Sequence, residues 1–377
     1  MRNNLYVQTR ILHFLGFVFH VLAAKTLNSL KCRSPLEALV IKFNEFLVPL
    51  SFAASDVMSD GVTIIAGSDI DGRVYKSVDE GITWTEVWKA SGTLVRCVFI
   101  DSRDYIFVSA MGSSALYRST GGGATFEKAL SLPSGTSPDR TCIWGMIEDD
   151  TGNLYAGNYD TYHAIIYKSV DEGHSWFKVY DDPSQRHIHQ VVMNPESGWI
   201  YATDGDNPSD GGVLRSKDQG STWTRIVKMG VQFVAITFRR KDVFLGADAM
   251  GRRDGIYKFT DDGEDFFIPK RVLQARSSFF WGRTTPDGII VFGGVCDKTQ
   301  IGWPAKLKAF HRSLSSTCAV WASNDGGAHW TESLNRGVLG HDKGFRFASH
   351  KFSKSNYLFL YDESEVNGIK IRISKET

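Results

Sequence analysis

The sequence predicts an all-β protein, a β-propeller of six to seven four-stranded antiparallel blades with seven favoured. Three observations predict this fold: an eight-residue motif recurs along the chain, short alternating strands surround each copy, and the copies are spaced like propeller blades. The composition agrees, because 36 glycines and only 10 prolines among 377 residues suit many tight turns between short strands. A hydrophobic content of 42% provides enough apolar side chains for a large core.

The recurring motif, called the box below, has the pattern Ser-x-Asp-x-Gly-x-Thr-Trp. Its six copies read SVDEGITW, STGGGATF, SVDEGHSW, SKDQGSTW, the degenerate FTDDGEDF, and SNDGGAHW. Successive copies are 42, 50, 47, 43 and 64 residues apart, counted between their third residues, which are Asp79, Gly121, Asp171, Asp218, Asp261 and Asp325. A period of about 45 residues is typical of one propeller blade.

The residue types of the box are those that close a tight hairpin. The glycine permits a backbone turn that other residues resist, and the Asp carboxylate accepts hydrogen bonds from turn amides. The Ser and Thr hydroxyls add local hydrogen bonds, and the aromatic ring anchors the hairpin in the core. Because folding explains every position, we predict a structural rather than a catalytic role for the box, carried by Asp79, Asp171, Asp218, Asp261 and Asp325.

Four short strands accompany each period. One strand precedes the box, as in RVYKS or ALYRS, one follows it, as in TWTEVW, and two lie upstream, as in RCVFID and YIFVSA. After the last box, GFRFASHK, NYLFLYD and GIKIRIS supply three more strands without a box. We therefore assign residues 49–377 to the propeller. We predict that a strand such as ALVIKF, in an N-terminal extension over residues 25–48, completes the seventh blade and removes an exposed edge.

The boxes resemble those of the Asp-box (bacterial neuraminidase repeat) propellers of the sialidase superfamily, over roughly residues 50–335. The resemblance implies that the boxes lie at the blade periphery, away from an active site, and it implies little about activity. The family's Phe/Tyr-Arg-Ile-Pro motif is missing before the first box, and FFIPKR, which looks similar, overlaps the fifth box. Sialidase activity itself is therefore not predicted.

The N-terminus has the layout of a secretory signal peptide over residues 1–24. Arg2 and Arg10 precede an apolar run from residue 11 to residue 24 that ends in small residues and is short for a membrane span. A buried leading helix or a wrongly assigned start would look similar. The expected location is secreted or extracytoplasmic. The net charge of +1 gives no reason to expect a nucleic-acid partner.

Several cations fall at equivalent positions of the predicted innermost strands, which line the channel of a propeller. Arg140, Arg186 and Arg276, with Lys343, stand just before the strand, whereas Arg96, His189 and Arg346 share a position three residues further along. Converging guanidinium groups suit a carboxylate or a sulfate. The alternative is that these side chains form salt bridges between blades or are solvated.

The string RHIHQ places His187 and His189 two residues apart, so both imidazoles point to one face of a strand. Asp204 and Asp206 follow the neighbouring strand and are expected near the same end of the blade. Such a group could act as a base on a sugar, with Asp204 and Asp206 binding the substrate. It could instead hold a divalent cation near His187, His189 and Asp204, or be a hydrogen-bonded structural cluster. No other cofactor is expected.

Two further candidates complete the predicted site. Tyr159, after the second strand of the third blade, is expected at the same rim as a second acid/base group, although an ordinary rim role is also possible. An insertion over residues 296–318 carries Trp303 among basic residues, which suits sugar stacking as well as a stiffened surface loop. Cys296 and Cys318 bracket it and form a disulfide or remain separate thiols.

Two functions follow. The first is a carbohydrate-active propeller that processes an acidic oligo- or polysaccharide, uronate or sialylated, by lyase or glycosidase chemistry at the channel mouth. In residue types, His187, His189, Tyr159 and the arginines resemble the sites of seven-bladed propeller polysaccharide lyases. There, His and Tyr exchange protons and Arg neutralises the carboxylate. The second is a non-catalytic propeller that binds a protein or a glycan. Either is expected to be a monomer without a membrane span.

Overall fold

The computed structural model describes residues 41–48, 54–59, 63–68, 70–79, 81–133, 140–159, 163–206, 211–248, 254–275, 277–295, 319–333, 345–347, 357–362 and 367–375. The chain forms two compact units, Met1–Leu39 and Val40–Thr377, and all the described residues belong to the second. The predicted signal peptide, the 296–318 insertion with its two cysteines, and Arg276 and Trp303 therefore lie outside the described residues. Among the described residues, no helix is long and apolar enough to cross a membrane.

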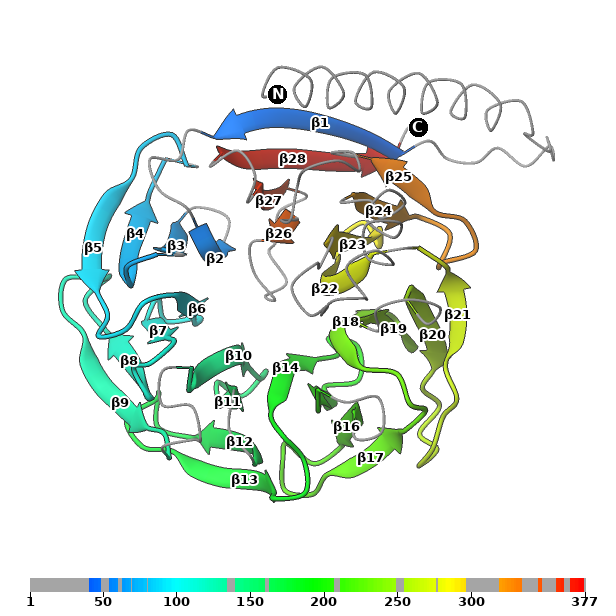
Figure 1. Ribbon diagram of the computed structural model, residues 1–377, viewed down its shortest axis with the longest axis horizontal. Coiled ribbons are helices and arrows are strands. Elements are labelled where there is room, and N and C mark those ends of the chain that lie inside the picture. Colours follow the sequence, from blue (N-terminus) through cyan, green and yellow to red (C-terminus); the bar gives the residue numbers. More distant parts are fainter. Residues whose placement is uncertain are drawn as a thin grey trace, which may run out of the picture. The chain divides into compact units, whose positions relative to one another are not determined.

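The described strands form seven four-stranded antiparallel sheets, which radiate around a central channel (Figure 1). This confirms the predicted fold class and the favoured blade number. The innermost strands are β2 (Ala54–Ser59), β6 (Val95–Ile100), β10 (Cys142–Glu148), β14 (Ile188–Met193), β18 (Phe233–Arg239), β22 (Ser278–Thr284) and β26 (Phe345–Phe347). The second strands are β3 (Ile64–Ser68), β7 (Ile106–Ala110), β11 (Leu154–Tyr159), β15 (Ile200–Asp204), β19 (Asp242–Ala247), β23 (Ile290–Val295) and β27 (Tyr357–Asp362).

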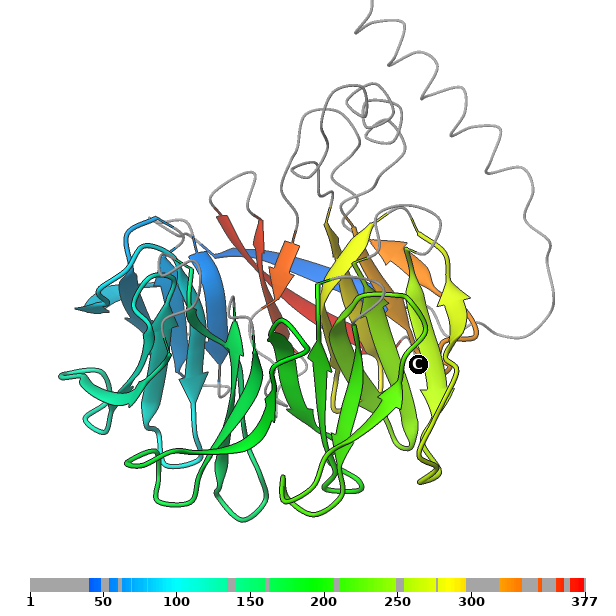
Figure 2. The ribbon, with the colours of Figure 1, turned by 60° about the horizontal axis from the view of Figure 1, so that its bottom comes forward.

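The third strands are β4 (Arg73–Ser77), β8 (Ala115–Ser119), β12 (Ala164–Ser169), β16 (Gly212–Ser216), β20 (Ile256–Thr260), β24 (Val320–Ser323) and β28 (Asn367–Lys375). The outermost strands are β5 (Thr85–Lys89), β9 (Glu127–Ser131), β13 (Phe177–Asp182), β17 (Thr224–Val227), β21 (Lys270–Leu273), β25 (Thr331–Ser333) and β1 (Ile41–Val48). In the tilted view of Figure 2 the inner strands run along the channel.

The seventh blade is built from both ends of the propeller. Strand β1 pairs antiparallel with β28, from Ile41 opposite Lys375 to Val48 opposite Gly368, and becomes the outermost strand of that sheet. The strand begins three residues after the start of ALVIKF. Pairing the first strand with the last covers an edge that three C-terminal strands would leave open.

The core lies between neighbouring blades. The second strands are buried on both faces, so β3, β7 and β15 read as runs of buried residues rather than as alternating ones. Every residue of the outermost strands β5, β9 and β13 is either exposed or half-buried. Aromatic rings from the boxes contribute to these layers. Trp176 packs in an edge-to-face arrangement against Phe107, which belongs to the preceding blade, with the ring centroids 6.4 Å apart.

The boxes form the hydrogen-bonded turns that the sequence predicts. In the first box Asp79 accepts from the Ser77 hydroxyl at 2.8 Å, the Thr83 amide at 2.9 Å and the Thr83 hydroxyl at 2.5 Å. Asp171 and Asp218 accept the same three bonds in their boxes, and Asp325 accepts from Ser323 and from the amide and ring of His329.

Asp261 differs, because Phe259 replaces the box serine. Its carboxylate pairs instead with the buried Arg215 at 2.5 Å and accepts from the Tyr201 hydroxyl at 2.8 Å.

A cation immediately before the box links neighbouring blades at several of the boxes. The residue immediately before the box donates to a backbone carbonyl of the box in the next blade, at 2.8 to 3.1 Å. The donor–acceptor pairs are Lys76 and Gly122, Arg118 and Glu172, Lys168 and Gln219, and Lys258 and Gly326. The accepting residues all have positive φ, between 55° and 76°, which turns their carbonyls outward to meet the cation.

Candidate functional site

The channel mouth is formed where the innermost strands begin, and a β-bulge marks that point in six blades. In each, the register between the first and second strands skips one residue, and the skipped residues are Ser55, Arg96, Trp144, His189, Val234 and Phe280. A bulge re-aims its side chain and is common beside functional sites. The shared position predicted for Arg96 and His189 is thus a structural equivalence, and Trp144 belongs to the same set.

Three consecutive bulge residues contact one another around the mouth. The guanidinium carbon of Arg96 lies 5.0 Å from the ring centroid of Trp144, and the Trp144 ring lies 5.5 Å from that of His189. Tyr159, the last residue of β11, joins this row. Its ring centroid is 4.5 Å from Trp144 and 4.2 Å from His187, and 5.8 Å from the Arg96 guanidinium. The second, third and fourth blades thus contribute to one cation–aromatic group.

An ionic group lies directly beside Tyr159. Asp206 Oδ1 is 3.0 Å from His187 Nε2 and 3.5 Å from His189 Nε2, and Asp206 Oδ2 is 2.5 Å from Arg186 Nη1. His189 Nε2 also donates to the Gly205 carbonyl at 2.9 Å. The imidazoles are perpendicular, with centroids 4.7 Å apart. His187 is 0% exposed and His189 2%, whereas the Asp206 side chain is 23% exposed.

The protonation states follow from this environment. Burial, reinforced by the charge of His187, lowers the pKa of His189 to about 3, so its imidazole is neutral at physiological pH. Burial alone would raise the pKa of Asp206, but the hydrogen bond from His187 and the charges of His187, His189 and Arg186 lower it to about 2. Asp206 is therefore a carboxylate, unsuited to act as an acid.

Asp204 does not join this group, contrary to the prediction that it binds substrate or a cation with the histidines. It is fully buried, and Arg225 of the outermost strand β17 binds both of its oxygens, at 2.7 and 2.5 Å. The reason is local. Gly205 has φ 78° and its amide bonds to the His187 carbonyl, so the chain turns and brings Asp206, rather than Asp204, to the mouth.

The remaining predicted residues are placed in different ways. Arg186 lies in the group, and Arg140 is exposed just before β10. Arg346 is the central residue of the inner strand β26, and its side chain lies outside the description. Arg276 and Trp303 are outside the described residues. Trp144 and the turn at Gly205 were missed, and the signal that could have found Trp144 is its alignment with Arg96 and His189.

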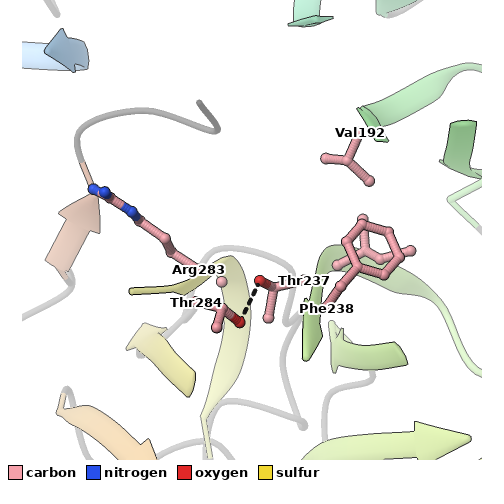
Figure 3. A pocket seen from close by; sticks show the side chains of 7 residues that line it. Val192, Thr237, Phe238, Arg283 and Thr284 are labelled. Carbon is pink, nitrogen blue, oxygen red and sulfur yellow. Dashed lines mark hydrogen bonds between the residues drawn. The ribbon is translucent and has the colours of Figure 1, made fainter. Parts of the chain in front are cut away.

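A small cavity lies further down the channel, where the innermost strands end. It is lined by Val192 of β14, Ile236, Thr237 and Phe238 of β18, and Gly282, Arg283 and Thr284 of β22. Figure 3 shows the Thr237 and Thr284 hydroxyls bonded at 3.0 Å and Arg283 extending away from them. Burial lowers the pKa of Arg283 to about 10. Val192 lies about 16 Å along its strand from His187, so the cavity and the mouth are separate features.

No protein-family model matches the chain. A segment of 191 residues is 26% identical to a xyloglucanase of Hypocrea jecorina, and covers 41% of this chain but only 23% of that enzyme. The chain therefore spans less than a quarter of the length of the relative it matches.

Among solved structures, a virginiamycin B lyase of Staphylococcus aureus superposes with a TM-score of 0.61 at 13% identity, covering 88% of this chain and 99% of that one. A xyloglucanase of Xanthomonas campestris superposes with a TM-score of 0.60 at 16% identity, covering 85% of this chain and 52% of that one. At these identities the superpositions support the propeller fold alone.

Proposed function

We propose that this chain is a carbohydrate-active propeller, which binds a polysaccharide across the channel mouth and cleaves it there. The observation that carries the proposal is the row formed by Arg96, Trp144 and Tyr159. The side chains of Arg96 and Tyr159 are partly exposed, and both contact the indole ring of Trp144. Aromatic faces beside a cation suit sugar stacking combined with contacts to hydroxyl or carboxylate groups. The sequence similarity to a xyloglucanase supports a glycan as the ligand.

The groups at the mouth favour elimination over hydrolysis. Glycoside hydrolysis generally needs two carboxyl groups, one of them protonated to act as the acid. Asp206 is the carboxylate in contact with the described group, and its contacts with His187 and Arg186 hold it ionised. Elimination needs a cation on the sugar carboxylate, a base for the neighbouring C–H proton and an acid for the leaving oxygen. Arg96 would supply the cation, and Tyr159 would serve as both base and acid, taking the C–H proton and passing a proton to the leaving oxygen, which points to an acidic glycan such as a polyuronate.

Within this proposal the buried histidines act through Tyr159. Tyr159 contacts the sugar because it is partly exposed, and the ring of His187 packs against its ring with the two centroids 4.2 Å apart. Asp206 holds the His187 imidazole from the other side. His187 and Asp206 are then positioning residues, whereas Tyr159 and Arg96 touch the substrate.

The burial of both imidazoles favours a second candidate, a propeller that binds glycan without cleaving it. An imidazole with 0% to 2% exposure does not touch a polymer. In that case Tyr159 and Arg96 supply affinity and no bond is broken.

The experiment is a glycan panel that includes xyloglucan and several polyuronates, measured for reducing ends and for the ultraviolet absorbance of an unsaturated product. We expect cleavage with new absorbance on a polyuronate, falling about 100-fold or more in Tyr159→Phe. Tyr117→Phe, which removes a hydroxyl bonded to Ser91 on the outer part of the second blade, is the matched control and keeps full activity. Reducing ends without absorbance indicate hydrolysis, and binding without products indicates the second candidate. No binding to any glycan overturns the proposal.

A further inference from the structure

We propose that His187, His189 and Asp206 form a binding site for a divalent transition-metal ion, with zinc the best match. Two imidazole Nε2 atoms and one carboxylate oxygen converge, and all three lie within 4.8 Å of one another. Two imidazole nitrogens with one carboxylate oxygen are a donor set typical of zinc. Magnesium and calcium instead bind mainly oxygen ligands. The inference does not depend on the proposed glycan function.

The donor spacing is close to what a zinc ion requires. Bonds of about 2.0–2.2 Å in a tetrahedral arrangement put neighbouring ligand atoms about 3.3 Å apart. Asp206 Oδ1 lies 3.0 Å from His187 Nε2 and 3.5 Å from His189 Nε2, on either side of that value. The donor atoms of the two imidazoles lie within 4.8 Å of each other, so they need to approach by at most about 1.5 Å, within the reach of small side-chain rotations. Three protein donors leave a fourth position for water or a ligand group.

The surroundings hold the carboxylate and the rings in place. Arg186 occupies Asp206 Oδ2, which leaves Oδ1 turned toward the imidazoles, and the Gln232 amide approaches Oδ1 at 3.4 Å. Outer partners of this kind orient metal ligands and tune their affinity. His189 Nδ1 is buried and has no hydrogen-bond partner among the described residues, so it can carry the ring proton when Nε2 exchanges its hydrogen bond to the Gly205 carbonyl for the metal.

Other His–carboxylate pairs in the described part of the chain lack this arrangement. His163 contacts Asp181 at 3.2 Å and His329 contacts Asp325 at 2.6 Å, but each pair is at the surface and contains a single imidazole. The mouth group is the one place among the described residues where three such donors meet. His163 therefore provides a matched control for a substitution at the site.

The test uses the full chain without a histidine tag, stripped with a chelator and titrated with zinc alone against a chromophoric chelator. We expect one equivalent of zinc to bind, with affinity falling at least 100-fold in His189→Asn and Asp206→Asn and unchanged in His163→Asn. Thermal unfolding of each metal-free variant, compared with the metal-free parent, checks that the fold persists. The parent should also gain several degrees in Tm on adding zinc, because the ion binds only the folded chain.

X-ray absorption at the zinc edge of the parent provides a measurement that needs no variant. A first shell of nitrogen and oxygen atoms together with the outer-shell scattering of two imidazole rings supports the site. The proposal is overturned by the absence of stoichiometric binding, by a spectrum without imidazole, or by zinc that His163→Asn removes as effectively as His189→Asn does.

Discussion

The box end of each blade and the channel mouth belong to the same strands but differ in how far they repeat. The third strand β12 begins near the mouth and ends about 17 Å away at the box of Asp171, because its six residues are extended. At the box end, the same serine, aspartate and glycine recur in blade after blade. At the mouth, the equivalent bulge position holds six different residues.

This difference separates two kinds of requirement. A residue that solves a folding problem is needed once per blade, so the box motif recurs with the fold. A ligand is not seven-fold symmetric, so the residues that contact it must differ from blade to blade. The bulge provides a common backbone position on which Arg96, Trp144 and His189 can vary without changing the sheet.

The largest effect at the box end is expected where the motif departs from its pattern. In Asp261→Ala, the fully buried Arg215 loses its carboxylate, and the free energy of unfolding should fall by about 3–5 kcal/mol. Denaturation with urea measures this change. The neighbouring exposed Asp262→Ala should stay within about 0.5 kcal/mol of the parent. Equal effects of the two substitutions would contradict the assignment of Asp261 to a buried ion pair.

The next effect concerns the mouth and depends on pH. The pKa of Asp206 is lowered in the folded chain from 3.8 to about 2, so its contribution is complete above pH 4 and is lost as the pH falls through 2. Asp206→Asn should therefore be less stable than the parent by about 2 kcal/mol at pH 5, and this difference should shrink toward pH 2. Unfolding free energies at both pH values measure it. A difference that does not change with pH argues against the ionic contact, and Asp150→Asn, at an exposed turn, is the control.

The aspartate of a regular box should contribute less to the free energy of unfolding than Asp261 or Asp206 does. Asp171→Ala removes acceptors for the Ser169 hydroxyl and for the amide and hydroxyl of Ser175, and should cost about 1–2 kcal/mol, as loss of a helix N-cap does. Denaturation together with the glycan assay measures it. Because the box is structural, activity per folded molecule should be unchanged, and a selective loss of activity would place function at the box end.

The smallest effect is a gain. Gly121 stands where the other boxes have aspartate, its φ is not positive, and an added Cβ would meet only the Ala124 Cβ, at 3.8 Å. Gly121→Asp should let the carboxylate accept bonds from Thr125 and should stabilise the chain by about 0.5–1 kcal/mol. Thermal unfolding tests this, and Gly121→Asn, which cannot supply the charge, should gain less. Destabilisation by Gly121→Asp would mean that the second blade closes its turn differently.

The repeated part of the molecule could be predicted from sequence because the same motif and the same flanking strands recur along the chain. The spacing of the six boxes predicted the propeller architecture, and the alternating segments around them predicted four strands in each blade. The site was harder, because it depends on contacts between blades and on one backbone turn. Asp204 and Asp206 look equivalent in sequence, but the left-handed conformation of Gly205 turns them in different directions, and Arg225 binds the carboxylate of Asp204. Trp144 was overlooked because an apolar side chain on an inner strand looks like ordinary core.

Hydrogen exchange measured by mass spectrometry, with and without an oligosaccharide from the polymer that binds best, tests the central claim that the mouth is the functional region. Protection should concentrate at the starts of β6, β10 and β14 and at the turn through Asp206, with none at the boxes of Asp79, Asp171 and Asp218. Protection at the boxes or on the outer strands, with exchange at the mouth unchanged, would contradict it.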